Sequence, residues 1–258
     1  MSDLVAYQLD DGVATLTMKM EGKVYAVPWI WGATSVTYNT KVFSQAPSSL
    51  SVLWDPKYAD RVCWRDNPED SVRFAALALG QNPDKPEDLD AITEKLKSLK
   101  PQIKAFWKSE DEWRKLVSAN ECDLTIFWTS SANKAIKDGF PVAYFVADEG
   151  AIAFRDGLVI PADSSNRDAA HKFIDYMISR GFYQLWVEKG GAPISANAEA
   201  VNDLPDSSPT RKMLSDPETV GRINFKGPLS EDQREAVTVI RTSGEHLRQL
   251  INDILDLS

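Results

Sequence analysis

The sequence has few of the residues on which catalytic and metal sites depend. It contains two histidines and two cysteines in 258 residues. Cys63 and Cys122 match no zinc-ligand spacing, and neither belongs to a Cys-x-x-Cys pair. No Walker or dinucleotide glycine pattern is present, and no nucleophile and base lie at a recognisable spacing. The sequence therefore predicts a protein that is not an enzyme, with no cofactor and no metal site.

Basic charge and long apolar runs are also scarce. Lys and Arg number 29 against 38 Asp and Glu, which gives a net charge of −9. An acidic balance argues against nucleic acid as a partner and suits a cationic small ligand. No apolar run approaches the length of about 20 residues that a membrane-spanning helix needs. The start, Met1-Ser2-Asp3-Leu4, lacks the basic and apolar regions of a signal peptide. We therefore expect a cytoplasmic protein if this sequence is the full product.

Core-forming residues are present in an ordinary share, with 43% hydrophobic and 26% charged residues. Strand patterns alternate with helix patterns along the middle of the chain, which favours an α/β fold with a largely parallel sheet. Two early strands are expected at 24–30 and 35–39. A helix is expected to begin at the cap Asn67 and to end before Gly80.

The two cysteines leave an alternative open. Cys63 and Cys122 each lie at the start of a strand, and the two strands are expected to be neighbours in one sheet. A disulfide is then geometrically feasible if the two Cα atoms lie within roughly 7 Å. Two buried free thiols explain the same residues equally well.

The stretch 149–161, EGAIAFRDGLVIP, predicts a β-strand that is entered through a glycine and ends at a proline. Strand side chains alternate between faces, so Phe154 and Asp156 share one face and Arg155 lies on the other. An aromatic ring beside a carboxylate can hold an organic cation. The same pattern is also typical of an amphipathic strand whose aspartate is solvated. Taken by itself, the stretch favours this simpler interpretation.

The two ends of the chain resemble unrelated families. Residues 1–22 alternate around Asp10-Asp11-Gly12 as a β-hairpin and resemble the opening hairpin of enoyl-CoA hydratases, without implying acyl-CoA chemistry. Residues 229–258 predict a long helix with an apolar heptad seam, and they resemble the second dimerisation helix of sensor histidine kinases. The phosphoacceptor motif of that family is absent, so we do not expect His246 to carry phosphate. An uncovered seam predicts weak self-association through 230–257.

The middle of the chain, about residues 22–233, resembles the substrate-binding proteins of bacterial polyamine (spermidine/putrescine) ABC importers. The resemblance rests on YAVPWIWGATSVTYN at 25–39, SLSVLWDPKYADRVCWRD at 49–66, CDLTIFWTSSA at 122–132, EGAIAFRDGLVIP at 149–161 and AAHKFIDYMIS at 169–179.

This resemblance implies a type II periplasmic-binding-protein-like fold, in which two α/β lobes close on the ligand. It also implies a periplasmic location and a membrane permease as partner. Residues 23–150 correspond to a complete second lobe. Residues 151–228 correspond to a partial first lobe with the hinge, because the family's long opening segment has no counterpart here.

The resemblance further implies four ligand-binding residues. Trp128 matches a tryptophan that stacks on the methylene groups of the ligand, and Asp156 matches a carboxylate that pairs with a ligand amine. Phe154 takes the place of an aromatic residue that is usually Trp, and Asp70 lies where the family often has a ligand-facing acid. The residues alone also allow Trp128 to be a core residue at a strand end. They likewise allow Asp70 to be a first-turn helix residue.

Three functional hypotheses follow. The first is a solute-binding protein that holds a polyamine and delivers it to an ABC importer. The second is a signalling module in which a solute-binding lobe is joined to a kinase-type dimerisation helix. The third is a truncated fusion that binds nothing. The self-association of 230–257 separates the second hypothesis from the first, and the sequence does not name which polyamine or other solute is bound.

Overall fold

The computed structural model describes residues 9–10, 13–14, 18–20 and 23–225. Its strands are β1 (Leu9–Asp10), β2 (Val13–Ala14), β3 (Met18–Met20), β4 (Lys23–Asn39), β5 (Val62–Arg65), β6 (Ile103–Trp107), β7 (Leu124–Trp128), β8 (Val142–Phe145), β9 (Ala151–Leu158), β10 (Ile194–Ser195) and β11 (Ile223–Phe225). Its helices are α1 (Pro68–Ala78), α2 (Leu89–Ser98), α3 (Glu110–Ser118), α4 (Thr129–Lys137), α5 (Arg167–Met177), α6 (Arg180–Lys189), α7 (Ala198–Asn202), α8 (Pro209–Leu214) and α9 (Pro217–Gly221).

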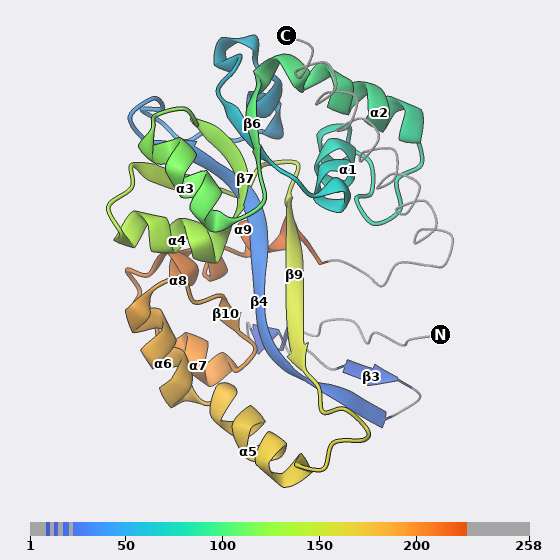
Figure 1. Cartoon of the computed structure of the whole chain (residues 1–258), viewed down its shortest axis with the longest axis vertical. Coiled ribbons are helices and arrows are strands. Elements are labelled where there is room, and N and C mark those ends of the chain that lie inside the picture. Colours follow the sequence, from blue (N-terminus) through green and yellow to red (C-terminus); the bar gives the residue numbers. More distant parts are fainter. Residues whose placement is uncertain (1–8, 11–12, 15–17, 21–22, 226–258) are drawn as a thin grey trace.

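One sheet organises this part of the chain, with strand order β11-β9-β4-β7-β5-β6 and with β3, β8 and β10 also paired to β4. Figure 1 shows β4 and β9 running along the long axis of the molecule. Helices α1 to α4 lie around one end of β4, and α5 to α7 lie around the other end. The two strands therefore connect the two halves of the structure.

Strand β4 is continuous over 17 residues, where the sequence predicted two separate strands at 24–30 and 35–39. The residues between those strands pair with β9 one by one, from Trp31 opposite Arg155 to Thr34 opposite Ile152. Their backbone groups bond to the neighbouring strand, so no break forms at Gly32. The prediction of two strands was wrong because it used local pattern without this long-range pairing.

The sheet is mixed, so the prediction of a largely parallel sheet was also wrong. Strand β4 is antiparallel to β7, β8, β9 and β10. Parallel pairing is found between β5 and β6, between β5 and β7, and between β9 and β11. The α/β alternation led to the expectation of a parallel sheet, but the central strand runs against its neighbours.

Local signals placed helix α1 correctly. The Asn67 side chain accepts a hydrogen bond from the backbone N–H of Asp70 at 3.0 Å, and Pro68 occupies the first helical turn. Just after the helix, Gly80 has φ of +70°, a conformation that glycine adopts without steric cost. These features fix where α1 begins and therefore where the Asp70 carboxylate lies.

The predictions for the chain ends are tested only in part. Strands β1 and β2 pair antiparallel, with Leu9 opposite Ala14. The other residues of the hairpin predicted for 1–22 lie largely outside the described ones, so that hairpin and its family resemblance stay predictions. The predicted helix at 229–258 lies outside the described residues, as do the self-association surface 230–257 and His246. Those expectations stay predictions.

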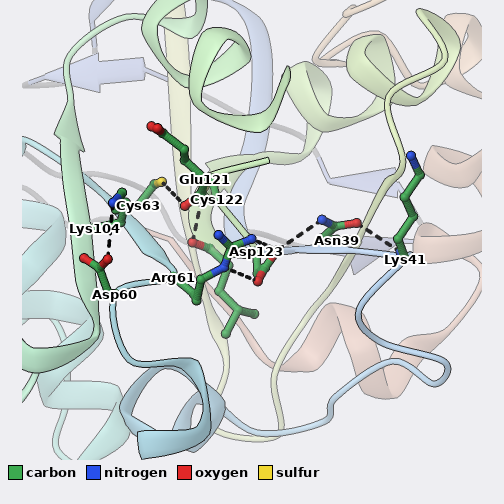
Figure 2. A network of polar contacts seen from close by, with 10 residues as sticks. Asn39, Lys41, Asp60, Arg61, Cys63, Lys104, Glu121, Cys122 and Asp123 are labelled. Carbon is green, nitrogen blue, oxygen red and sulfur yellow. Dashed lines mark hydrogen bonds and ion pairs between the residues drawn. The ribbon is translucent and has the colours of Figure 1, made fainter. Parts of the chain in front are cut away.

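A buried ion pair joins the starts of β5 and β7 to the end of β4 (Figure 2). The Asp123 carboxylate is 5% exposed and accepts hydrogen bonds from Arg61 Nε at 2.6 Å and Nη2 at 2.9 Å. Asn39 Nδ2 donates to the same carboxylate at 3.1 Å. The hydrogen bonds to Asp123 raise the pKa of the Arg61 guanidinium above its ordinary value. This network locks three strands at the edge where β5 and β7 begin.

Cys63 and Cys122 are both free and buried, which is one of the two alternatives that the sequence allowed. Figure 2 shows them close to the ion-pair network, with the Cys63 thiol directed at the backbone oxygen of Glu121. Burial raises the pKa of the Cys122 thiol well above its usual value, and a hydrogen bond with Cys63 adds to this effect. The Cys122 thiol is therefore protonated and unreactive.

Candidate ligand-binding site

A pocket of about 380 Å³ brings all four predicted site residues together. Its wall consists of Thr34, Arg65, Asn67, Asp70, Trp128, Ser130, Ser131, Phe154 and Asp156. These residues come from four strands and from the cap and first turns of two helices, so segments far apart in the sequence converge on one cavity. That these four residues bind a ligand stays a proposal.

The pocket opens where two parallel strands end. Strands β5 and β7 lie side by side, and their last residues are Arg65 and Trp128. Helices α1 and α4 begin directly after these strands. Sheets of this kind bind ligands beyond the carboxyl ends of their strands, because the side chains and helix starts there surround an open crevice.

Asp156 supplies a carboxylate that is open to a ligand. Its side chain is exposed at the pocket, and within the described part of the chain it has no hydrogen-bond or ion-pair partner. Partial removal from water nevertheless raises the pKa of its carboxyl above the ordinary value. A cation placed here would relieve that desolvation penalty, since its charge favours the ionised carboxylate.

Phe154 lies two residues before Asp156 on β9 and lines the same pocket. This confirms that the two side chains share one face of the strand, as the alternation of the sequence predicted. In the sheet register Phe154 is opposite Gly32 on β4. The pocket therefore has an aromatic ring next to an available carboxylate.

Asp70 lies in the wall of the pocket, but its carboxylate is already engaged. The residue is 1% exposed, and its Oδ2 accepts a hydrogen bond from Arg65 Nη1 at 2.6 Å. It sits in the first turn of α1, where the helix dipole favours a negative charge. The structure thus gives Asp70 the helix role that the sequence allowed and pairs it with a cation of the chain itself.

Trp128 ends β7 and is half-buried. Its ring packs edge-on against Trp107, with centroids 6.2 Å apart and an interplanar angle of 79°. The guanidinium carbon of Arg65 lies 4.1 Å from the centroid of the Trp128 ring. Trp128 therefore belongs both to the core and to the pocket, and one of its faces is covered by an arginine.

Arg65 is the charged residue of the pocket wall that the sequence analysis did not predict, and Thr34, Asn67, Ser130 and Ser131 were not predicted either. Two local signals could have indicated Arg65. It is a charged residue at the carboxyl end of a predicted strand, and it precedes the helix cap Asn67 by two residues. The strand-end rule would then have placed its side chain at the same crevice as Trp128.

The chemistry that the pocket offers is binding by charge, stacking and hydrogen bonds. Its wall carries carboxylates, hydroxyls, an amide, a guanidinium and aromatic rings, without histidine or cysteine. Among the described residues, no group of three or more His, Cys, Asp or Glu side chains could hold a metal ion. The described helices also include none that is long and apolar enough to cross a membrane.

The chain is similar in sequence to polyamine-binding proteins of bacteria. It is 28% identical over 210 residues to a spermidine/putrescine-binding periplasmic protein of Salmonella typhimurium, covering 80% of this chain and 60% of the relative. It is also 28% identical over 199 residues to the protein of that name from Escherichia coli, covering 76% and 57%. The chain spans about 60% of the length of the curated relatives that it matches.

Solved structures show the same fold. The spermidine/putrescine ABC transporter substrate-binding protein PotD of Streptococcus pneumoniae matches with a TM-score of 0.74 and 21% identity, over 88% of this chain and 70% of that one. The protein MotA of A. tumefaciens, solved in complex with glucopine, matches with a TM-score of 0.67 and 26% identity, over 85% and 72%. The expected type II periplasmic-binding-protein fold is thereby confirmed, with the chain representing part of it.

A profile of the family described as bacterial extracellular solute-binding protein matches residues 1–213. The matched region includes every residue of the pocket and most of the sheet. The resemblance to polyamine-importer proteins that the sequence motifs indicated is confirmed by the relatives named above. The chain belongs to the bacterial extracellular solute-binding protein family.

Proposed function

We propose that the pocket binds a small organic cation of the polyamine type without chemical conversion, as the first step of uptake through an ABC importer. The observation that carries this proposal is the Asp156 carboxylate, which has no partner among the described residues and lies beside Phe154 in a pocket of about 380 Å³. The names of the relatives, which include spermidine/putrescine-binding and putrescine-binding proteins, support the same class of ligand.

The chemistry of a polyamine matches these two residues. Its ammonium groups need a carboxylate, and its methylene groups need an apolar or aromatic surface. Asp156 can accept a charge-assisted hydrogen bond from an ammonium, and Phe154 can contact the adjoining methylene groups. The carboxylate should dominate, because an unpaired desolvated charge costs on the order of 2–5 kcal/mol. A cation–π contact contributes roughly 0.5–2 kcal/mol.

The setting that we propose is the periplasm, with the permease of an importer as partner. The relatives named above are periplasmic or transporter-associated proteins. We further propose that 23–150 forms the second lobe and 151–228 the remaining part of the first lobe. The course of β4 and β9 through both halves of Figure 1 supports this division, because such strands can serve as the hinge. The relatives are solute-binding proteins and lend no support to the signalling alternative.

A thermal-shift experiment tests the proposal on the full chain. A ligand that binds the folded state stabilises it by RT ln(1 + [L]/Kd), which is about 2.7 kcal/mol at a hundredfold excess over Kd. Putrescine, spermidine and spermine are each expected to raise the melting temperature. The matched control is 1,4-butanediol, which has the methylene chain of putrescine without its charges and should give no shift. Equal shifts for the diol and the diamine, or none for any amine, would refute binding of a cation.

A further inference from the structure

The guanidinium of Arg65 lies between the two pocket groups that best suit a second ligand cation. Its Nη1 is 2.6 Å from Asp70 Oδ2, and its central carbon is 4.1 Å from the centroid of the Trp128 ring. The Arg65 side chain is 20% exposed, and the carboxylate of Asp70 is 1% exposed. The chain therefore contains a complete cation-binding arrangement, an aromatic face beside a buried carboxylate, and fills it with its own arginine.

The local structure holds this arginine in place. Arg65 ends β5, and its backbone oxygen accepts a hydrogen bond from the N–H of Asn67 at 2.8 Å. Asn67 in turn caps helix α1 at Asp70. Arg65 and Asp70 thus belong to one short strand-to-helix connection, and the cation is tethered beside its carboxylate. A tethered group acts at a high effective concentration, so a free ammonium competes poorly for the same place.

Asp156 differs from Asp70 in this respect. Both carboxylates line the pocket, but within the described residues no cation lies on Asp156. With the Arg65–Asp70 pair neutral as a unit, Asp156 gives this part of the pocket one uncompensated negative charge. One negative charge is matched by a ligand with one ammonium group in the pocket.

We propose that Arg65 is a specificity-determining residue that occupies a second cation position and leaves one ammonium position, at Asp156 and Phe154, for the ligand. This inference rests on the proposed function and narrows its ligand class. A second ammonium on the ligand gains nothing from Asp70 and Trp128 while Arg65 is present. The protein should therefore bind a monoamine and a diamine of equal chain length with similar affinity.

Calorimetry of the unmodified chain and of Arg65→Ala with butylamine and putrescine tests this directly. In the unmodified chain the two amines should bind with affinities within about threefold of each other. Putrescine gains affinity only because either of its two equivalent ends can occupy the one ammonium position. In Arg65→Ala, putrescine should gain at least about tenfold over butylamine, because its second ammonium replaces the guanidinium on Asp70 and Trp128. Arg65→Lys keeps a tethered cation and should keep the original ratio. An Arg65→Ala ratio equal to that of the unmodified chain would overturn the proposal.

A second readout does not depend on binding at Asp156. Removing the guanidinium takes the Arg65 cation away from the buried Asp70 carboxylate, so Arg65→Ala should melt at a lower temperature than the unmodified chain. Methylguanidinium at millimolar concentration should restore part of that loss in Arg65→Ala and have no effect on Arg65→Ala/Asp70→Asn. Absence of this rescue would overturn the role of Arg65 even if amines bind elsewhere.

The two readouts also separate this inference from the proposed function. If the unmodified chain binds no amine, the proposed function fails, whereas rescue of Arg65→Ala by methylguanidinium would still support the cation position at Asp70. If Arg65→Ala does not fold without an added cation, recovery of folding with methylguanidinium becomes the measurement. Failure to recover it would count against the proposal.

Discussion

The ring of Phe154 lies so close to Gly32 that a β-carbon at position 32 would be 2.7 Å from Cζ and 2.9 Å from Cε1 of the ring. The two residues are opposite each other in the pairing of β9 with β4. Because glycine has no side chain, the ring can lie over the neighbouring strand. This contact sets the position of the aromatic residue in the pocket beside Asp156.

Substituting Gly32 should therefore weaken ligand binding through Phe154. In Gly32→Ala the added methyl group displaces the ring, and the affinity for putrescine should fall about two- to fivefold, the equivalent of an exposed cation–π contact. Gly181→Ala is the matched control, since a β-carbon there meets nothing within 4 Å. It lies in the first turn of helix α6, away from the pocket. Calorimetry that finds the same affinity for both variants would argue against a binding role for Phe154.

The raised pKa of Asp156 makes ligand binding depend on pH. Desolvation raises the pKa of this carboxyl above its ordinary 3.8, so protonation begins at a higher pH than for a free aspartate. Since only the ionised form pairs with an ammonium, the affinity for putrescine should fall on acidification from about pH 7 to about pH 4. Calorimetry across this range should show a smaller fall for Asp156→Asn. An affinity that increases on acidification would exclude this carboxylate as the ligand partner.

The effect of the same group on folding has the opposite sign. An acid whose pKa is raised in the folded state favours folding below its unfolded pKa, and this contribution is lost as the pH rises through the folded pKa. At neutral pH the ionised Asp156 therefore adds no stability. Asp156→Asn should be at least as stable as the unmodified chain at pH 7, which urea unfolding can measure.

The ion pair of Arg61 and Asp123 should be important for stability and not for binding. Asp123→Asn should lower the free energy of unfolding by about 3 kcal/mol, because it breaks a pair whose carboxylate is buried. This value is the lower end for a broken buried pair, since the Arg61 guanidinium that remains is partly exposed. The control is Asp60→Asn, whose side chain is 69% exposed and pairs with Lys104 at 3.2 Å (Figure 2). Its loss should be below about 1 kcal/mol. Equal losses in urea unfolding would mean that the buried network does not hold the sheet together.

The two cysteines should behave as protected thiols. Because burial raises the pKa of the Cys122 thiol, the folded protein should react very slowly with Ellman's reagent at mildly alkaline pH. After unfolding in urea without a reductant, both Cys63 and Cys122 should react. Reaction of the folded and unfolded protein on the same timescale would contradict the buried position of these thiols. Detection of fewer than two thiols after unfolding would indicate a disulfide.

The family resemblance indicated the four site residues, and local sequence patterns predicted the elements that carry them. Trp128 ends a strand, Phe154 and Asp156 share a face of another, and Asp70 follows a helix cap. Each of these features is set by residues close in the sequence, and the structure has each of them. The rule for strand ends in α/β sheets accounts for the place of Trp128 and Asp70, whereas Phe154 and Asp156 reach the pocket from within β9.

What the sequence did not predict depends on long-range pairing. Arg65 was missed although β5 and β7 were expected to be neighbours, because its contact with Trp128 depends on the register of these two strands. The pairing of Arg65 with Asp70, in contrast, joins residues that are close in the sequence. The unbroken course of β4 likewise depends on its pairing with β9. Short-range periodicity carries no information on such neighbours.

The central claim, that Asp156 anchors a ligand cation, is tested most directly by calorimetry of putrescine with the unmodified chain, Asp156→Asn and Asp163→Asn. Asp163 is exposed and lies outside the pocket, so its substitution removes the same charge without touching the site. Asp156→Asn should weaken binding at least about 30-fold, which corresponds to the loss of roughly 2 kcal/mol or more. Asp163→Asn should bind as the unmodified chain does. Binding that survives undiminished in Asp156→Asn would contradict the account.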